Sequence, residues 1–524
     1  MKKIILLSLI FFTLVADSCK KALNVTPTRV VNETNTWNTI EDARAAIMGV
    51  YGLTRSALAE NNGHWIYGDV RMGNFASPNR QDLKAVITNN LNAEYPVLNE
   101  LSNWRRFYAI VNAANIFMER IHEIKEKDLR YTENNMTVDL AQVRFLRAFA
   151  YFYMIRIWGD VPFITSSREG TFENQPRSDQ GALLNFVQTE METAAADMPY
   201  EYSNNDVQQP GLYYYRGNWS GILIKKLGAY AMLAEVAAWE GKYTDVIRYT
   251  QKVLSEYNTR DDLSLTGTST LTASNGFFYN NTNGGNDNQL FAFGFGWNVQ
   301  EAAFTGNIES LALAAPVVNK NIPDIYVPKD SILSIFKEPG DGRFNVDTSG
   351  VTHSDALNAP NVKGYFTNFL GKYPIFAKIK CIMGGGSDPS FRLFSSAIVL
   401  TRLEDVYLLR AEAYAVLGEN DLAIADLNTV RQERYNVDDH GLSQSDYVAY
   451  SAGSSGPLVD AIFRERQKEF MGEGDHWYDR IRMEKIKQSN PQFLQLISSG
   501  GIYWPISRDI LAQNPLLTQN SYWK

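Results

Sequence analysis

Apolar residues recur at every third or fourth position along most of this chain, which is the spacing of amphipathic α-helices. Helices are predicted at residues 40–56, 97–125, 137–157, 179–197, 219–240, 243–257, 402–417, 420–434 and 459–484. Residues 258–300 and 338–395 lack this period and are rich in Gly, Asn, Ser and Thr, which predicts loops with short strands. The predicted fold class is therefore mostly α, with loop and short-strand insertions in a helical scaffold.

Two of the predicted helix pairs resemble each other. Residues 233–254 and 410–431 each end one helix at a glycine, Gly241 or Gly418, and place Val246 or Ala423 in the next helix. Such a pair matches the tetratricopeptide pattern of two antiparallel helices joined by a tight turn. Glycine suits the turn because it adopts a left-handed backbone at low cost. A third copy is predicted at residues 137–157, and the uneven spacing of the copies indicates a scaffold interrupted by insertions.

The N-terminus has the layout of a secretory signal peptide. Lys2 and Lys3 precede an apolar run at residues 4–15, and residues 16–18 lead into Cys19. The run is shorter than the roughly 20 apolar residues that a membrane span needs. A cysteine directly after the cleavage region is typical of bacterial lipoproteins, so we expect residues 1–18 to be removed and Cys19 to be lipidated. The alternative is an ordinary signal peptide. With Cys19 lipidated, Cys381 is the remaining thiol and no disulfide is expected.

Composition and motifs favour a binding protein over an enzyme or a nucleic-acid partner. The chain has 524 residues and a net charge of −8, without a cluster of basic residues such as phosphate contacts require. Its five histidines are dispersed, with no HExxH motif and no zinc-like spacing, and neither a P-loop nor a GxSxG elbow occurs. We therefore expect no catalysis, no metal and no cofactor.

Two stretches combine aromatic side chains with planar polar groups, the mixture that binds sugars. An aromatic ring packs on the apolar face of a sugar, and amide, carboxylate or guanidinium groups hold neighbouring hydroxyls. The stretches are residues 64–74 and 277–298. Their glycan-binding candidates are Trp65, Tyr67, Arg71, Asn74, Tyr279, Trp297 and Asn298. If the assignment is right, alanine at both Trp65 and Trp297 abolishes glycan binding.

Packing in the core is the competing interpretation for each aromatic group. Phe291, Phe293 and Phe295 alternate at period two, which places them on one face of a strand and indicates core. The same alternative applies to Trp65 and Tyr67. We expect Arg343 to pair internally. Four further tryptophans on predicted helices are expected in the core: Trp104, Trp158, Trp239 and Trp477.

Short motifs in a fixed order along nearly the whole mature chain resemble the SusD/RagB family, the cell-surface lipoproteins of nutrient-uptake systems in Bacteroidetes. The strongest is residues 465–470 (ERQKEF), followed by residues 473–474 (EG) and 477–479 (WYD). The supporting segments are residues 23–28, 49–51, 144–148, 159–162, 408–414, 505–506, 514–515 and 519–520. Three places depart from the family pattern, at Gln467, at residues 475–476 (DH) and at Ser507, and we expect none of them to lie at a ligand site.

The resemblance implies a SusD-like fold without catalysis: a signal peptide at 1–18, an N-terminal helical region at 19–257 and a C-terminal region at 258–524. It also implies a lipid-anchored protein on the outer face of the outer membrane. Such a protein would bind an oligosaccharide or polysaccharide and deliver it to a SusC-like TonB-dependent transporter. Two alternatives remain open, capture of peptides and a pure docking module for the transporter.

Overall fold

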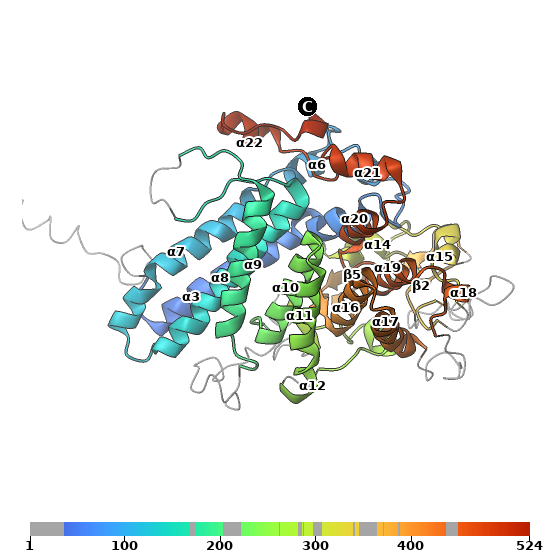
Figure 1. Ribbon diagram of the computed structural model, residues 1–524. Helices are drawn as coiled ribbons and strands as arrows, with labels where there is room; N and C mark the ends of the chain where they lie inside the picture. The colour runs from blue at the N-terminus through green and yellow to red at the C-terminus, as the bar shows by residue number, and fades with distance from the viewer. Residues whose placement is uncertain are drawn as a thin grey trace, which may run out of the picture.

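The structure is a computed structural model of the chain (Figure 1). It describes residues 36–167, 173–202, 222–260, 263–280, 286, 288–296, 307–338, 341–344, 364–369, 371–385, 388–435 and 449–524. The predicted signal peptide and Cys19 lie outside these residues, as do Trp297 and Asn298.

Long helices make up most of the described chain, which confirms the mostly α prediction. In chain order they are α3 (Ile40–Ala59), α7 (Arg105–Lys127), α8 (Glu133–Trp158), α9 (Gln180–Asp197), α10 (Lys226–Glu240), α11 (Tyr243–Leu254), α16 (Leu403–Leu417), α17 (Asn420–Arg434), α19 (Leu458–Glu469) and α20 (His476–Lys487). Each packs mainly on its neighbours in sequence, from α3 on α7 through α10 and α11 to α16 and α17. Figure 1 shows this array running from α3 and α7 at one side to α17 and α19 at the other.

Local sequence explains how individual helices begin and how they are buried. A capping box starts α3, in which Thr39 N donates to Asp42 Oδ2 (2.8 Å) and Asp42 N donates to Thr39 Oγ1 (3.3 Å). Helix α8 is buried on all sides along its C-terminal half, because it packs between α7 and α9. Apart from Arg147 and Arg156, its sequence there, from Phe145 to Trp158, is correspondingly apolar all round rather than amphipathic.

The two predicted helix pairs are confirmed. Helix α10 ends at Gly241 (φ 77°) and α16 ends at Gly418 (φ 85°), both in the left-handed conformation, and α11 and α17 pack back on them. Val246 and Ala423, expected in the second helix of each pair, are fully buried. The third predicted copy is α8, which ends at Gly159 (φ 74°).

Shorter elements lie around this array. The helical ones are α4 (Gly63–Trp65), α5 (Gln81–Ile87), α6 (Pro96–Leu101), α12 (Tyr257–Arg260), α13 (Thr268–Thr272), α14 (Ile308–Ala312), α15 (Lys329–Ile335), α18 (Ala452–Ser455), α21 (Pro491–Ser498), α22 (Arg508–Gln513), η1 (Glu60–Asn62), η2 (Ile66–Val70) and η7 (Ser521–Trp523). Three antiparallel two-stranded ladders occur in the described regions: β1 (Gln289–Phe293) with β6 (Ile398–Arg402), β2 (Phe366–Thr367) with β3 (Ile375–Phe376), and β4 (Ile382–Gly385) with β5 (Asp388–Phe394). The predicted insertions therefore do carry short strands.

Three predicted helices are wrong in extent. The helix predicted at 219–240 begins only at Lys226, since residues 222–225 are not helical. The segment 97–125 is divided into α6 and α7, and the segment 459–484 into α19 and α20. The second break follows from Gly472 (φ 82°) and Gly474 (φ 96°), whose left-handed backbone is incompatible with a continuing helix. This break turns α20 back along α19 and so creates the site described below.

The apolar core of the described residues consists of one large cluster and three smaller ones. Its largest cluster runs from Trp37 to Leu517 and includes Phe291, Phe293 and Phe295, which confirms the core interpretation of that strand. Trp104, Trp158, Trp239 and Trp477 are buried as expected. The cluster has no break at residue 257, and the division into regions 19–257 and 258–524 stays a prediction. Within the described residues, no helix is both long and apolar enough to span a membrane.

Candidate functional site

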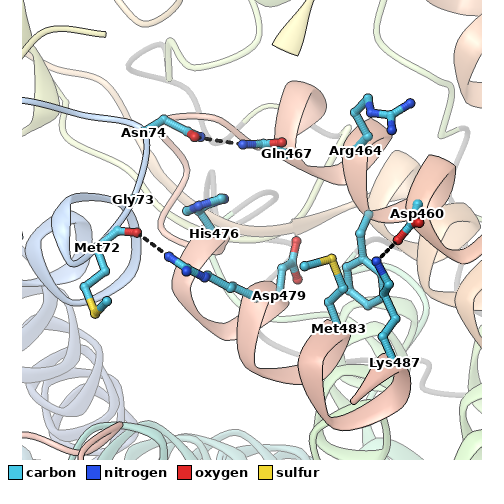
Figure 2. A pocket seen from close by; sticks show the side chains of 12 residues that line it. Met72, Gly73, Asn74, Asp460, Arg464, Gln467, His476, Asp479, Met483 and Lys487 are labelled. Carbon is cyan, nitrogen blue, oxygen red and sulfur yellow. Dashed lines mark hydrogen bonds and ion pairs between the residues drawn. The ribbon is translucent and has the colours of Figure 1, made fainter. Parts of the chain in front are cut away.

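A pocket of about 520 Å³ lies where the loop after η2 meets α19 and α20 (Figure 2). We call it the α19–α20 pocket. It is lined by Met72, Gly73, Asn74, Asp460, Phe463, Arg464, Gln467, His476, Asp479, Arg480, Met483 and Lys487.

Helical spacing explains why these side chains share the pocket. On α19 the lining residues Asp460, Arg464 and Gln467 recur at three or four positions, and on α20 the same spacing continues from His476 to Lys487. Residues between them, such as Arg466, turn the opposite way and are buried. One polar stripe of each helix therefore faces the pocket.

Close backbone contacts hold the loop against the two helices. A Cβ added at Gly68 would lie 1.8 Å from Gly474 O, so the two segments approach more closely than any side chain permits. Buried Asp69 accepts hydrogen bonds from Gly472 N (3.3 Å) and Gly474 N (2.5 Å), and burial raises the pKa of this carboxyl to about 7. At the pocket wall, Arg480 Nη1 donates to Met72 O (2.9 Å).

The polar groups of the pocket include an amide pair. Gln467 Nε2 donates to Asn74 Oδ1 (2.7 Å), which joins residues 393 positions apart (Figure 2). This bond leaves Gln467 Oε1 as an acceptor and Asn74 Nδ2 as a donor, both without another partner in the described part of the chain. His476 is half-buried beside them, and desolvation lowers its pKa to about 4, so the imidazole is neutral at neutral pH.

The floor of the pocket is a buried ion-pair network. Asp479 accepts from Arg466 Nε (2.9 Å) and Arg482 Nη2 (2.7 Å), and these cations hold the pKa of Asp479 below its usual range despite its burial. Arg466 also donates to Asp405 (2.7 Å). Although Asp479 lines the pocket, its carboxylate is therefore already occupied.

The predicted residues Trp65, Tyr67 and Arg71 lie in the core instead of at this surface. They are 2%, 1% and 0% exposed, so no aromatic face is open to a sugar ring. Trp65 Nε1 donates to Gly472 O (3.1 Å) and Tyr67 OH to Leu101 O (2.6 Å). Arg71 donates to the carbonyls of Gly501 and Ile502. These contacts join the N-terminal loop to distant segments, which is a packing role.

Of the other predicted site residues, Asn74 lines the α19–α20 pocket. Tyr279 is half-buried and forms an isolated β-bridge with Ser396, away from that pocket. Arg343 pairs with Asp341, Glu465 and Glu469, which confirms its expected internal pairing.

All three departures from the family pattern, which we expect to avoid any ligand site, lie at candidate pockets in the structure. Gln467 binds Asn74, and His476 lines the same pocket. Ser507 lines a second pocket of about 610 Å³, between residues 91–102 and the C-terminal segment. We call it the tail pocket. Its lining includes the half-buried Tyr95 and Trp523 and the exposed Asn92 and Asn99.

Sequence reasoning did not find Gln467, His476, Arg464 or Arg480 as site residues. Their spacing at three and four positions on the predicted helix 459–484 was the available signal. That spacing is equally typical of an ordinary solvated helix face, so it does not distinguish a pocket. Among the described residues, no group of His, Cys, Asp and Glu is arranged to hold a metal ion.

Comparison with known proteins places this fold in a family. Residues 186–495 match the family model described as "SusD family", and residues 31–211 match one described as "Starch-binding associating with outer membrane". The chain belongs to the SusD family. A crystal structure of a SusD superfamily protein from Bacteroides thetaiotaomicron is 42% identical, with a TM-score of 0.80 over 93% of this chain and 99% of that one.

Two further proteins are similar to the chain along nearly its full length. A SusD-like protein of Formosa agariphila is 26% identical, and the match covers 99% of both chains. The structure of NanU from B. fragilis covers 95% of this chain and 100% of its own, with a TM-score of 0.65 and 19% identity. At that identity the likeness shows a common fold alone.

Proposed function

We propose that this SusD-family chain binds an oligosaccharide or polysaccharide in the α19–α20 pocket, without catalysis, as an accessory protein of the outer membrane. Family membership and the "Starch-binding associating with outer membrane" description of the matched domain support this class of function. The observation that carries the choice of site is the Asn74–Gln467 amide pair, with its remaining donor and acceptor unused beside the neutral His476. Paired amide groups suit the neighbouring hydroxyls of a sugar.

The finer parts of the proposal concern anchoring and delivery. Residues 1–18 would be removed, Cys19 would carry the lipid, and the protein would face the cell exterior. There it would pass its glycan to a SusC-like TonB-dependent transporter. The support is the signal-peptide layout and the family. Fatty-acid labelling of the full-length protein tests the anchor, since Cys19→Ala should abolish labelling and release the protein from membranes.

Affinity electrophoresis of residues 20–524 against a panel of polysaccharides tests the glycan site. We expect retardation by at least one polymer, and loss of that retardation in Asn74→Ala. Asn92→Ala is the matched control, because it removes the same amide from the tail pocket. If Asn92→Ala loses binding while Asn74→Ala keeps it, the glycan site is the tail pocket and the assignment to the α19–α20 pocket is wrong.

Peptide capture and a pure docking role remain the alternatives. Absence of retardation by every polysaccharide would contradict glycan binding. Co-purification with the transporter would then support the docking role, and retention of a peptide library by the soluble chain would support peptide capture.

A further inference from the structure

Two arginines of the α19–α20 pocket, Arg464 and Arg480, form no ion pair with a carboxylate of the described residues. Arg464 Nη1 donates to Ser455 O (3.2 Å), and Arg480 Nη1 donates to Met72 O (2.9 Å). In the described part of the chain neither guanidinium has a carboxylate within ion-pair distance. Glu484 attracts Arg480 only at longer range, and burial lowers the pKa of this arginine. The guanidinium of Arg480 also lies 4.5 Å over the Phe493 ring.

This lack of partners is unusual for the region. On the same two helices, Arg466 pairs with Asp405 and Asp479, and Arg482 pairs with Glu412 and Asp479. Where an arginine of α19 or α20 is fully buried, it therefore meets carboxylates. The two that face the pocket meet carbonyl oxygens, which leave their positive charge uncompensated.

The acidic residues of the pocket do not neutralise these arginines. Asp460 pairs with Lys487, and both oxygens of Asp479 are held by Arg466 and Arg482. The uncompensated charge of the pocket is therefore positive, on a protein whose net charge is −8. Because partial burial weakens solvent screening, an anion there would gain more than at an open surface.

We infer that the α19–α20 pocket selects glycans that carry negative charge, with Arg464 and Arg480 each offering a guanidinium group to a carboxylate or sulfate of the glycan. This inference rests on the proposed glycan-binding function and names its substrate class. The planar guanidinium fork matches both anions. The Asn74–Gln467 pair would then hold hydroxyls of the same or a neighbouring residue.

The test uses polymers that share one backbone: dextran, carboxymethyl-dextran and dextran sulfate, together with polygalacturonate and its methyl ester. Affinity electrophoresis of residues 20–524 should show retention by a charged polymer and at least tenfold weaker retention by its neutral counterpart. The carboxylated and sulfated polymers distinguish the two anion sources. Since the protein is itself acidic, general charge attraction does not predict this result.

Arginine variants locate the interaction. R464Q/R480Q should weaken retention by the charged polymer at least tenfold. R130Q/R248Q is the control, because it removes the same charge from exposed arginines that pair with carboxylates elsewhere. R464Q alone serves if the double variant fails to fold, and we expect it to weaken retention severalfold.

Three other outcomes would contradict the inference. Equal retention by neutral and charged polymers, or retention unchanged in the arginine variants, would contradict anion selection while leaving glycan binding intact. If neither these polymers nor the wider polysaccharide panel retained the protein, the proposed glycan-binding function itself would be contradicted.

Discussion

The inner and outer faces of α19 both carry polar and charged side chains, but those of the inner face are buried in ion pairs and those of the outer face line the pocket. On the inner face, Glu465, Arg466 and Glu469 are at most 2% exposed, and each forms ion pairs with oppositely charged residues of neighbouring segments. On the outer face, Arg464 and Gln467 line the α19–α20 pocket with hydrogen-bonding capacity to spare.

The difference separates the residues that carry the family resemblance from those that we propose contact a ligand. The motif at residues 465–470 carries the strongest resemblance, and its charged members Glu465 and Glu469 meet Arg343 in the interior. Buried charges of this kind are expensive to desolvate and stable only when every partner is present. We infer that the motif preserves the fold, whereas positions between its inward residues set ligand preference.

Removal of one inner carboxylate should have the largest effect. Glu469 Oε1 accepts from Arg402 Nη1 and Arg434 Nη2, both at 2.8 Å, and Glu469 Oε2 accepts from Arg343 Nη1 at 2.9 Å. Glu469→Gln leaves three buried guanidinium groups without this charge and should lower the free energy of unfolding by about 3–5 kcal/mol. Urea denaturation of residues 20–524 followed by circular dichroism measures it. A loss below about 1 kcal/mol would mean that the network contributes little.

Sequence could predict the helices and not the pocket, for a physical reason. Helical period and the turn glycines Gly241 and Gly418 are local signals, and the structure follows them. The α19–α20 pocket depends on the contact of Asn74 with Gln467, which no local pattern encodes. The same limit applies to Trp65, because an aromatic residue beside polar ones has the same composition in a core as in a sugar site.

Crowding the backbone contact between Gly68 of η2 and Gly474 should have the next largest effect. Gly68→Ala would place a Cβ 1.8 Å from Gly474 O and should cost about 3 kcal/mol, while shifting the loop that carries Asn74. Both the unfolding free energy and glycan retention should fall. Gly52→Ala is the control: no atom lies within 4 Å of its added Cβ, and it should stabilise α3 by about 0.5–1 kcal/mol. Retention unchanged in Gly68→Ala would argue against a rigid pocket wall.

Buried Glu309, which has no cation within ion-pair distance among the described residues, should respond to pH in the opposite direction to the inner-face carboxylates. Glu309 accepts from Ser396 Oγ (2.7 Å) and Cys381 N (3.2 Å), and burial raises its pKa from 4.5 to about 7. The folded protein therefore takes up this proton below about pH 7, whereas the unfolded chain does so only near pH 4.5. Ionised Glu309 costs stability at pH 8, and that cost falls as the pH drops through 7.

The Glu309→Gln variant isolates this contribution. Relative to it, the unmodified protein should gain about 1 kcal/mol of unfolding free energy between pH 8 and pH 6, since one pKa unit is worth about 1.4 kcal/mol. Denaturation of both proteins at the two pH values measures the difference, because other titrating groups change equally in each. A constant difference between the proteins would show that Glu309 does not titrate in this range.

The outer face should tolerate a change of charge with almost no effect on stability. Gln467→Glu keeps the side-chain shape, and Asn74 can still donate to it through Nδ2, so the unfolding free energy should change by less than about 0.5 kcal/mol. The new carboxylate would lie one helical turn from Arg464 and compensate its charge, so retention by an anionic polysaccharide should fall. Gln495→Glu, at an exposed position on α21, makes the same charge change outside the pocket and should leave retention unaltered. Equal weakening by both variants would indicate that net charge, and not the pocket, governs binding; a large loss of stability in Gln467→Glu would place Gln467 with the structural residues of the inner face.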